Sequence, residues 1–187
     1  MKRRPPTIVV SGPPGSGKST LARMIAERLK LQYYSTGLIF REMARRRGLS
    51  LEELSKLAEQ DPEIDREIDS RTIEVAKKGG VVIDSHLAAW LLRDIADVKV
   101  GVIAPLRVRV ERIARRENRD PEEVERETRY REESERRRFW RYYRVDLTDL
   151  SVFDIVINTA TYNPEEALEL ALHAIDLVLK RRREQPF

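Results

Sequence analysis

Residues 11–20, SGPPGSGKST, limit the folds open to this chain more than any other segment does. They match the pattern G-x-x-x-x-G-K-[ST], with Gly12 and Gly17 as its glycines and Lys18 and Ser19 at its end. The β-branched run TIVVS comes directly before the pattern, and apolar side chains recur at helical spacing after it. A strand, a glycine loop and a helix in this order indicate a phosphate-binding loop. A simple Gly-Pro turn is the alternative, and the flanking pattern disfavours it.

Each part of such a loop has a physical role. The glycines let backbone N–H groups face a phosphate, and the N-terminus of the helix adds partial positive charge. We therefore expect Lys18 to reach the β- and γ-phosphates of ATP and the Ser19 hydroxyl to bind Mg²⁺. A loop of this kind defines the phosphate donor, but it leaves the acceptor open.

The rest of the chain alternates between strand and helix patterns in the same way. Helical stretches separate further apolar, β-branched runs, which lie at residues 31–35, 81–85, 98–104 and 153–160. Repeated βα order places the strands in parallel, with helices on both faces. The sequence therefore predicts a three-layer α/β domain of the P-loop NTPase type, with a mainly parallel five-stranded sheet.

The helices expected between residues 37 and 79 are very polar. Ser50 and Glu53 form a capping box for one of them, and Asp61 begins the next. Polar helices suit a small insertion at the edge of a sheet better than a central layer. Further helices are expected over residues 105–117, from Asp120 and from Asn163.

Length and composition narrow the choice of class. The chain has 187 residues, enough for one well-cored domain. Charged residues make up 36% of it, but the net charge is only +4, so the charge balance does not indicate a nucleic-acid partner. The absence of cysteine excludes disulfides and thiolate ligands. The first apolar run is too short for a signal peptide and no segment is long enough to span a membrane, so we expect a cytoplasmic protein.

Three side chains outside the loop are candidates for the site. Arg41 lies one helical turn beyond Gly37, near the end of the second expected strand, where open α/β sheets bind ligands; a surface charge is the alternative. Asp84 ends the strand VVID and would either approach Mg²⁺ or cap the following helix. His86 follows in the same loop, either as a structural residue or as a hydrogen-bond donor to a phosphate.

Residues 129–144, RYREESERRRFWRYYR, carry Arg131, Glu135 and Arg138 on one helical face. Phosphoryl transfer needs several positive charges around the transferred group, so we expect an arginine-bearing lid here. A solvated helix held by Glu–Arg pairs is one alternative. Another is nucleic-acid binding by the aromatic residues of this segment, together with the tail KRRREQPF. Basic residues that flank the segment are Arg112, Arg115 and Arg116.

Six segments together resemble the nucleoside monophosphate kinases and are most similar to the archaeal type of cytidylate kinase. They are SGPPGSGKST, STGLIFR, VVIDSH, ERIARRE, REESERRR and FDIVINT. The phosphate loop is shared by many families, whereas STGxxxR and the charge spacing of REESERRR are more specific. The chain departs from the common pattern at Leu38, where an acidic or small residue is frequent, and at His86, where many relatives have Arg.

The resemblance implies roles for particular residues. ATP would be held by Gly12, Pro13, Pro14, Gly15, Ser16, Gly17, Lys18, Ser19 and Thr20. The acceptor would meet Ser35, Arg41, Asp84, His86, Arg131, Glu135 and Arg138. Catalytic charge would come from Lys18, Arg115, Arg116, Arg131 and Arg138, and Mg²⁺ would be bound by Ser19 and Asp84.

We accordingly divide the single kinase domain into three parts. These are a core over about 5–36, 80–117 and 150–182, an insertion for the nucleoside monophosphate over about 37–79, and a lid over about 117–146. The expected activity is transfer of a phosphoryl group from ATP to CMP, and to dCMP. A kinase for another nucleoside monophosphate or small metabolite is an alternative, as is an RNA-binding or assembly factor switched by nucleotide.

Overall fold

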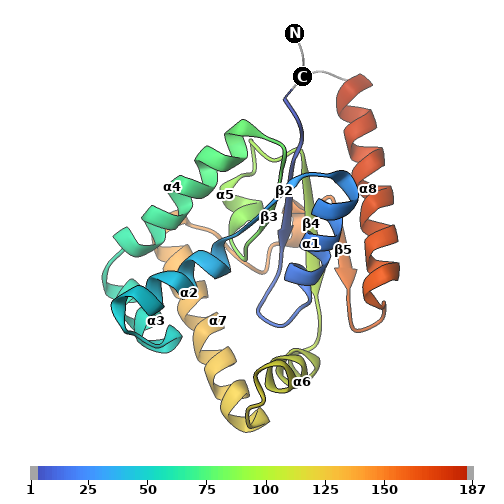
Figure 1. The fold of residues 1–187 in the computed structure, drawn as a ribbon. Helices are drawn as coiled ribbons and strands as arrows, with labels where there is room; N and C mark the ends of the chain where they lie inside the picture. The colour runs from blue at the N-terminus through green and yellow to red at the C-terminus, as the bar shows by residue number, and fades with distance from the viewer. Residues whose placement is uncertain (1–3, 185–187) are drawn as a thin grey trace.

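The computed structural model describes residues 4–184 and contains one five-stranded sheet in the order β2-β3-β1-β4-β5 (Figure 1). All four neighbouring pairs of strands are parallel. The strands are β1 (Thr7–Ser11), β2 (Gln32–Ser35), β3 (Val81–Asp84), β4 (Val98–Ile103) and β5 (Ile155–Asn158). The α/β fold class and the parallel sheet predicted from the sequence are confirmed.

Eight α-helices connect and cover the strands within the described residues. They are α1 (Lys18–Leu29), α2 (Thr36–Arg47), α3 (Leu51–Gln60), α4 (Glu63–Lys78), α5 (Ala88–Leu91), α6 (Leu106–Glu117), α7 (Pro121–Tyr143) and α8 (Pro164–Glu184). A short 3-10 helix lies at Leu150–Val152. In this part of the chain, no helix is both long enough and apolar enough to cross a membrane. The cytoplasmic location stays a prediction.

Two apolar clusters fill the space on either side of the sheet. On one face, Leu21 and Ile25 of α1 and Ile175 of α8 pack against strand residues such as Ile8. On the other face, the end of α4 and the short helix α5 cover the sheet, and their buried residues are Ala76, Ala88, Ala89 and Leu92. Figure 1 shows α1 and α8 beside each other and α4 and α5 on the opposite side. The predicted three layers are therefore present.

The polar helices α2, α3 and α4 share a small core of their own, formed by Ala44, Leu54, Ala58 and Ile64. The capping box expected at α3 is present: Ser50 Oγ accepts from Glu53 N, and the Glu53 carboxylate accepts from Ser50 N. These helices form a lobe beside the sheet (Figure 1). The limits of the insertion and of the lid stay predictions, because α4 belongs to both the lobe and the layer that covers the sheet.

Helix α7 joins two parts of the molecule. Near its start, Val124 packs against Val110 and Ile113 of α6. Near its end, Tyr142 Oη donates to the carbonyl oxygen of Ala58 in α3 at 3.0 Å. In Figure 1 the helix runs from the lobe of α2 and α3 down to α6. One unbroken helix therefore contacts both the insertion and the segment that follows β4.

Candidate functional site

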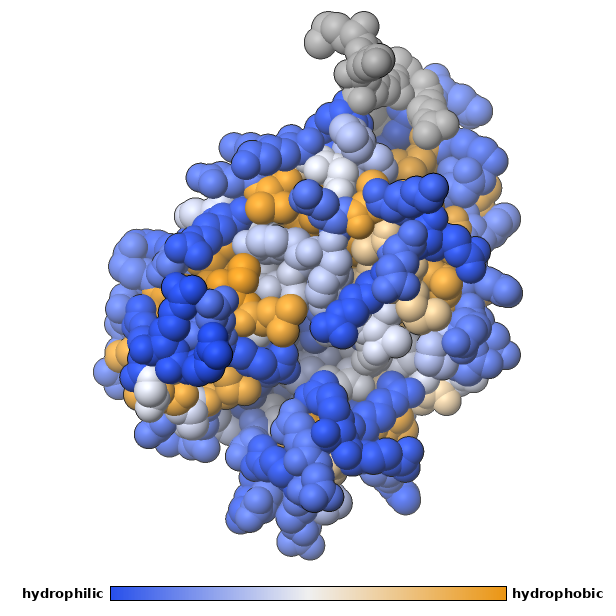
Figure 2. Space-filling model, viewed as in Figure 1, coloured by the Kyte–Doolittle hydropathy of each residue, from blue (hydrophilic) through white to orange (hydrophobic). Residues whose placement is uncertain are grey.

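A cavity of about 760 Å³ lies at the carboxyl ends of the strands. It is lined by the phosphate loop, by the insertion helices and by α6 and α7. In the space-filling view, the lobe of α2 and α3 and the hydrophilic lobe of α6 stand apart, with the recess between them (Figure 2). The size of the cavity is typical of sites that hold a small-molecule ligand.

The phosphate loop is held in a conformation that needs glycine. Gly15 and Gly17 have φ values of 77° and 89°, in the left-handed region. A Cβ atom on Gly15 would lie 2.7 Å from the carbonyl oxygen of Arg109. Two other side chains fasten the loop: Arg109 donates to the carbonyl oxygen of Pro14 at 3.1 Å, and Thr159 Oγ1 donates to that of Ser16 at 2.6 Å.

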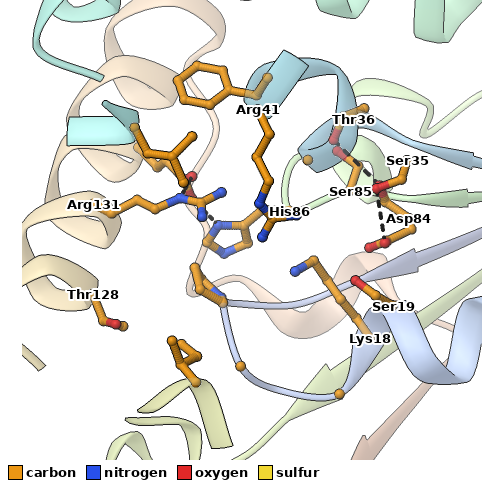
Figure 3. Close-up of a pocket in the computed structure, with 18 of the residues that line it drawn as sticks. Lys18, Ser19, Ser35, Thr36, Arg41, Asp84, Ser85, His86, Thr128 and Arg131 are labelled. Carbon is orange, nitrogen blue, oxygen red and sulfur yellow. Dashed lines mark hydrogen bonds and ion pairs between the residues drawn. The ribbon is translucent and has the colours of Figure 1, made fainter. Parts of the chain in front are cut away.

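Positive side chains converge on the space above this loop. Burial is the main cause that lowers the pKa of Lys18, and the charges of Arg131 and Arg41 lower it further, against the raising effect of Asp84 and Glu135. Desolvation also lowers the pKa of Arg41, with contributions from Arg131 and Arg116. Figure 3 shows Lys18, Arg41 and Arg131 pointing into the same space. Like charges held together in this way favour the binding of an anion.

Asp84 is held at the edge of this cluster. It lies opposite Ser35 in the pairing of β2 with β3, and its Oδ2 accepts from Tyr33 Oη at 2.7 Å and from Ser35 Oγ at 3.2 Å. Its Oδ1 is buried and has no hydrogen-bond partner in the described part of the protein. The helix that follows begins at Ala88, with Leu87 as its N-cap residue, so Asp84 does not cap it. The unpaired Oδ1 is therefore suited to bind a cation.

His86 contacts α7 from the loop after β3. Its Nδ1 lies 2.6 Å from Oε2 of Glu135, and Oε1 of the same carboxylate accepts from Arg131 Nε at 2.9 Å. Burial raises the pKa of Glu135, but Arg131 and His86 outweigh it, so the pKa lies below its ordinary value. Glu135 is therefore a buried, ionised group between two hydrogen-bond donors.

Comparison with known proteins places this site in a family. The sequence model of the cytidylate kinase-like family matches residues 7–161. The chain belongs to this family. It is 53% identical to a cytidylate kinase of Staphylothermus marinus over 92% of this chain and 98% of the relative. It is 57% identical to a cytidylate kinase of Aeropyrum pernix over 88% of this chain and 95% of the relative.

Solved structures with less similar sequences share the fold of this cytidylate kinase-like chain. A gluconokinase from Sinorhizobium meliloti has a TM-score of 0.65 at 17% identity and covers 100% of both chains. A shikimate kinase from Acinetobacter baumannii, solved with shikimate, has a TM-score of 0.58 at 20% identity and covers 95% of each. At this identity, the likeness concerns the fold alone.

Most of the residues that the family resemblance implied lie around the cavity. They are Pro14, Gly15, Gly17, Lys18, Ser19, Thr20, Ser35, Arg41, Asp84, His86, Arg116, Arg131, Glu135 and Arg138, and Arg112 lines it as well. Gly12, Pro13, Ser16 and Arg115 are not among the lining residues. Gly12 packs against β4 instead, where a Cβ atom would lie 2.1 Å from the carbonyl oxygen of Val102.

Three side chains that were expected to contact the ligand form hydrogen bonds with other protein groups. Ser35 Oγ caps α2 by accepting from Leu38 N at 3.4 Å, and it also donates to Asp84. Arg138 is 4% exposed, and its Nη1 lies 2.6 Å and 2.7 Å from the two carboxylate oxygens of Asp65. Glu135 accepts from His86 and Arg131. These side chains line the cavity, but the polar groups named here are bound by other parts of the protein.

The aromatic residues of α7 serve helix packing in this family member. Phe139 is buried, Tyr142 bonds α3, and Tyr143 Oη donates to Asp69 of α4. Trp140, at 53% exposure, is the one large side chain of this group that faces solvent. The segment therefore lacks a row of exposed rings on which bases could stack. Residues 185–187 of the basic tail lie outside the described residues.

Sequence reasoning missed three residues that support the site. Tyr33 bonds Asp84, and its position two residues before Ser35 on one strand is the signal that places both side chains on the same face. Arg109 and Thr159 fasten the phosphate loop, and Arg112 in turn donates to Thr159 Oγ1 at 2.9 Å and to its carbonyl oxygen at 2.7 Å. Nothing in the local sequence distinguishes Arg109 from an ordinary surface residue. Thr159 ends the segment FDIVINT, but that segment alone does not indicate a contact with the phosphate loop.

Proposed function

We propose that this protein transfers the γ-phosphoryl group of ATP to CMP, forming ADP and CDP. The observation that carries the proposal is the convergence of Lys18, Arg41 and Arg131 above a phosphate loop, in a chain of the cytidylate kinase-like family. Relatives that are 42–57% identical and carry the name cytidylate kinase support CMP as the acceptor. Phosphorylation of dCMP is a further expectation of the same proposal.

On the donor side, the backbone of Gly15 and Gly17 and the side chain of Lys18 would hold the phosphates of ATP. Arg112 and Arg116, which line the same cavity from α6, would face them. The N-terminus of α1 begins at Lys18, so its partial positive charge adds to the attraction. On the acceptor side, Arg41 and Arg131 would bind the phosphate of CMP.

Ser19 and Asp84 would hold Mg²⁺, because the hydroxyl and the unpaired Oδ1 of Asp84 supply the oxygen ligands that this ion prefers. When bound, Mg²⁺ neutralises negative charge on the phosphate oxygens. The oxygens of the acceptor phosphate are already ionised near neutral pH, so the protein needs no general base. Its residues position the two nucleotides in line, share the negative charge of the transferred group and exclude water.

A coupled assay of ADP formation tests the proposal, with CMP, dCMP, UMP, dTMP, AMP and GMP offered singly. CMP should give the highest kcat/KM, and dCMP should also react. Phosphorylation of another monophosphate alone would correct the acceptor. If no monophosphate reacts, the proposal fails, and RNA binding that weakens steeply with salt would favour the assembly factor instead.

Two variants sharpen this assay. Lys18→Ala should lower kcat by about a hundredfold or more, because a preorganised charge on the transferred group is lost. Arg115→Ala is the control, since Arg115 is exposed on α6 and does not line the cavity. It should keep the activity of the wild-type protein. Near-normal turnover by Lys18→Ala would contradict the role of the loop, and a loss with Arg115→Ala would restore the catalytic role that the sequence suggested for it.

A further inference from the structure

His86 connects the core of the protein to α7 through one buried carboxylate. The His86 side chain is 16% exposed and that of Glu135 is 8% exposed. Because an ionised carboxylate only accepts hydrogen bonds, the proton between them lies on His86 Nδ1. Glu135 therefore receives one bond from the loop after β3 and one from Arg131 on its own helix.

We propose that His86 is a positioning residue: its Nδ1–H fixes the Glu135 carboxylate, which in turn holds the Arg131 guanidinium over the phosphate loop. The inference rests on the proposed function and assigns a part in it that differs from direct contact with the acceptor phosphate.

The burial of Glu135 explains why this bond matters. A buried carboxylate is unfavourable unless both of its oxygens are paired with donors or positive charges. Arg131 occupies Oε1, so Oε2 depends on His86. The neighbouring Arg138 also carries positive charge, but its Nη1 is bound by Asp65. Without the imidazole, Oε2 would lose its donor, and Glu135 would turn toward water or toward another cation.

The geometry of Arg131 links this bond to the chemistry. Arg131 uses Nε to bind Glu135, and its two terminal nitrogens make no hydrogen bond within residues 4–184. In Figure 3 the Arg131 guanidinium lies beside His86, on the side of the cavity that faces Arg41. Fastening the guanidinium at Nε leaves both terminal nitrogens to bind anionic oxygens, as bidentate recognition of a phosphate requires.

The two nitrogens of His86 separate this role from direct binding of a phosphate. A positioning role needs the donor at Nδ1, whereas a phosphate ligand would use Nε2. The amide nitrogen of Asn occupies nearly the place of His Nδ1, and that of Gln occupies nearly the place of Nε2. His86→Asn and His86→Gln are therefore a matched pair that tests which nitrogen matters.

The test measures kcat and KM for CMP phosphorylation in the wild-type protein and in His86→Ala, His86→Asn and His86→Gln. His86→Ala should lower kcat by about tenfold to a hundredfold, since one transition-state donor is misplaced rather than removed. His86→Asn should recover most of the loss, and His86→Gln should not. Recovery by Gln alone, or by neither variant, would overturn the proposal.

A double-mutant cycle with Arg131→Ala gives the second readout. If His86 acts through Arg131, His86→Ala should cause almost no further loss of kcat in the Arg131→Ala protein. Independent losses that multiply would contradict the proposal. Thermal unfolding of each variant identifies any that fail to fold, and His86→Asn then carries the comparison.

Binding of inorganic tripolyphosphate, measured by calorimetry, keeps this result separate from the proposed function. It should weaken severalfold in His86→Ala and return in His86→Asn, even if CMP proves not to be the acceptor. Unchanged binding in His86→Ala would count against the positioning role. A wild-type protein that binds tripolyphosphate but phosphorylates no monophosphate would contradict the proposed function alone.

Discussion

Asp69 shows how burial changes the chemistry of a single carboxyl group. It lies on α4, lines the cavity and accepts a hydrogen bond from Tyr143 of α7. Burial is the main cause that raises its pKa from 3.8 to about 7, and the nearby charge of Asp65 adds to it. Near neutral pH, this group therefore changes between a neutral and a charged form.

This titration predicts a pH-dependent stability. Between pH 3.8 and about 7 the folded protein holds a proton that the unfolded chain has released, so the stability from this group is complete below pH 3.8. That stability is lost as the pH rises through 7. Asp69→Asn keeps an acceptor for Tyr143 and cannot ionise. In urea titrations it should therefore be more stable than the wild type at pH 8, and the difference should shrink at pH 5.

Asp94→Asn is the control for this prediction, because it makes the same change from acid to amide at an exposed position. A stabilisation by Asp69→Asn of equal size at pH 5 and pH 8 would contradict the raised pKa as its cause.

The limits of sequence reasoning are clear at the scale of single residues. Helical spacing predicts that Arg131, Glu135 and Arg138 share a face, because that depends only on the period of the helix. Their partners come from distant segments: Asp65 is 73 positions from Arg138, and His86 is 49 positions from Glu135. Pairings of this kind depend on how the helices pack, so the sequence alone could not predict them.

At the scale of elements, the N-terminus of α3 allows a direct test of how much a capping box stabilises its helix. Its capping box satisfies two backbone N–H groups, at Ser50 and Glu53. Ser50→Ala should destabilise the protein by about 1 kcal/mol, because it leaves the Glu53 N–H at the start of the helix without its partner. Denaturant unfolding at neutral pH measures this difference.

Ser70→Ala is the matched control for the capping box, since Ser70 is exposed in the interior of α4. There Ala should be neutral or slightly stabilising, because its helix propensity is higher than that of Ser. Equal effects of the two substitutions would show that the cap contributes nothing beyond helix propensity.

The order of strands and helices could be predicted from the sequence, but the extent of some short elements could not. The strand expected over residues 153–160 is confined to Ile155–Asn158, because Phe153 packs against Trp90 and Thr159 turns toward the phosphate loop. The segment after β3 forms only the four-residue helix α5. Ala88, Ala89 and Leu92 of this segment are completely buried, so it belongs to the core.

At the scale of the whole molecule, the order of strands and helices was predictable because each βα unit carries its own pattern. The path of α7 across the molecule could not be predicted in this way. Its charge pattern suggested an arginine-bearing lid or, alternatively, a solvated helix held by Glu–Arg pairs, but its second half is fastened to the insertion. Arg137 lies 3.1 Å from Glu59 of α3, and Arg138 binds Asp65 of α4. The mobility of the lid stays a prediction. Because α7 contacts the insertion, any motion of the lid would also act on the insertion.

This arrangement predicts that the two nucleotides bind cooperatively. Calorimetry with a non-hydrolysable ATP analogue should give a lower Kd for CMP than in its absence, and CMP should lower the Kd of the analogue by the same factor. A factor of about 5 or more would fit coupling through α7. Tyr142→Phe, which loses the bond to Ala58, should reduce the factor while Kd values measured singly change little. Equal affinities with and without the second nucleotide would contradict this view.

The continuity of α7 also affects how fast water hydrolyses ATP when CMP is absent. If α7 orders the donor side fully only when CMP fills the acceptor side, then a water molecule that enters the half-filled cavity meets an incomplete set of charges. Hydrolysis of ATP would then stay slow until its proper acceptor arrives. The preference for CMP over water as the phosphoryl acceptor would then depend on the continuity of α7 as much as on any single side chain.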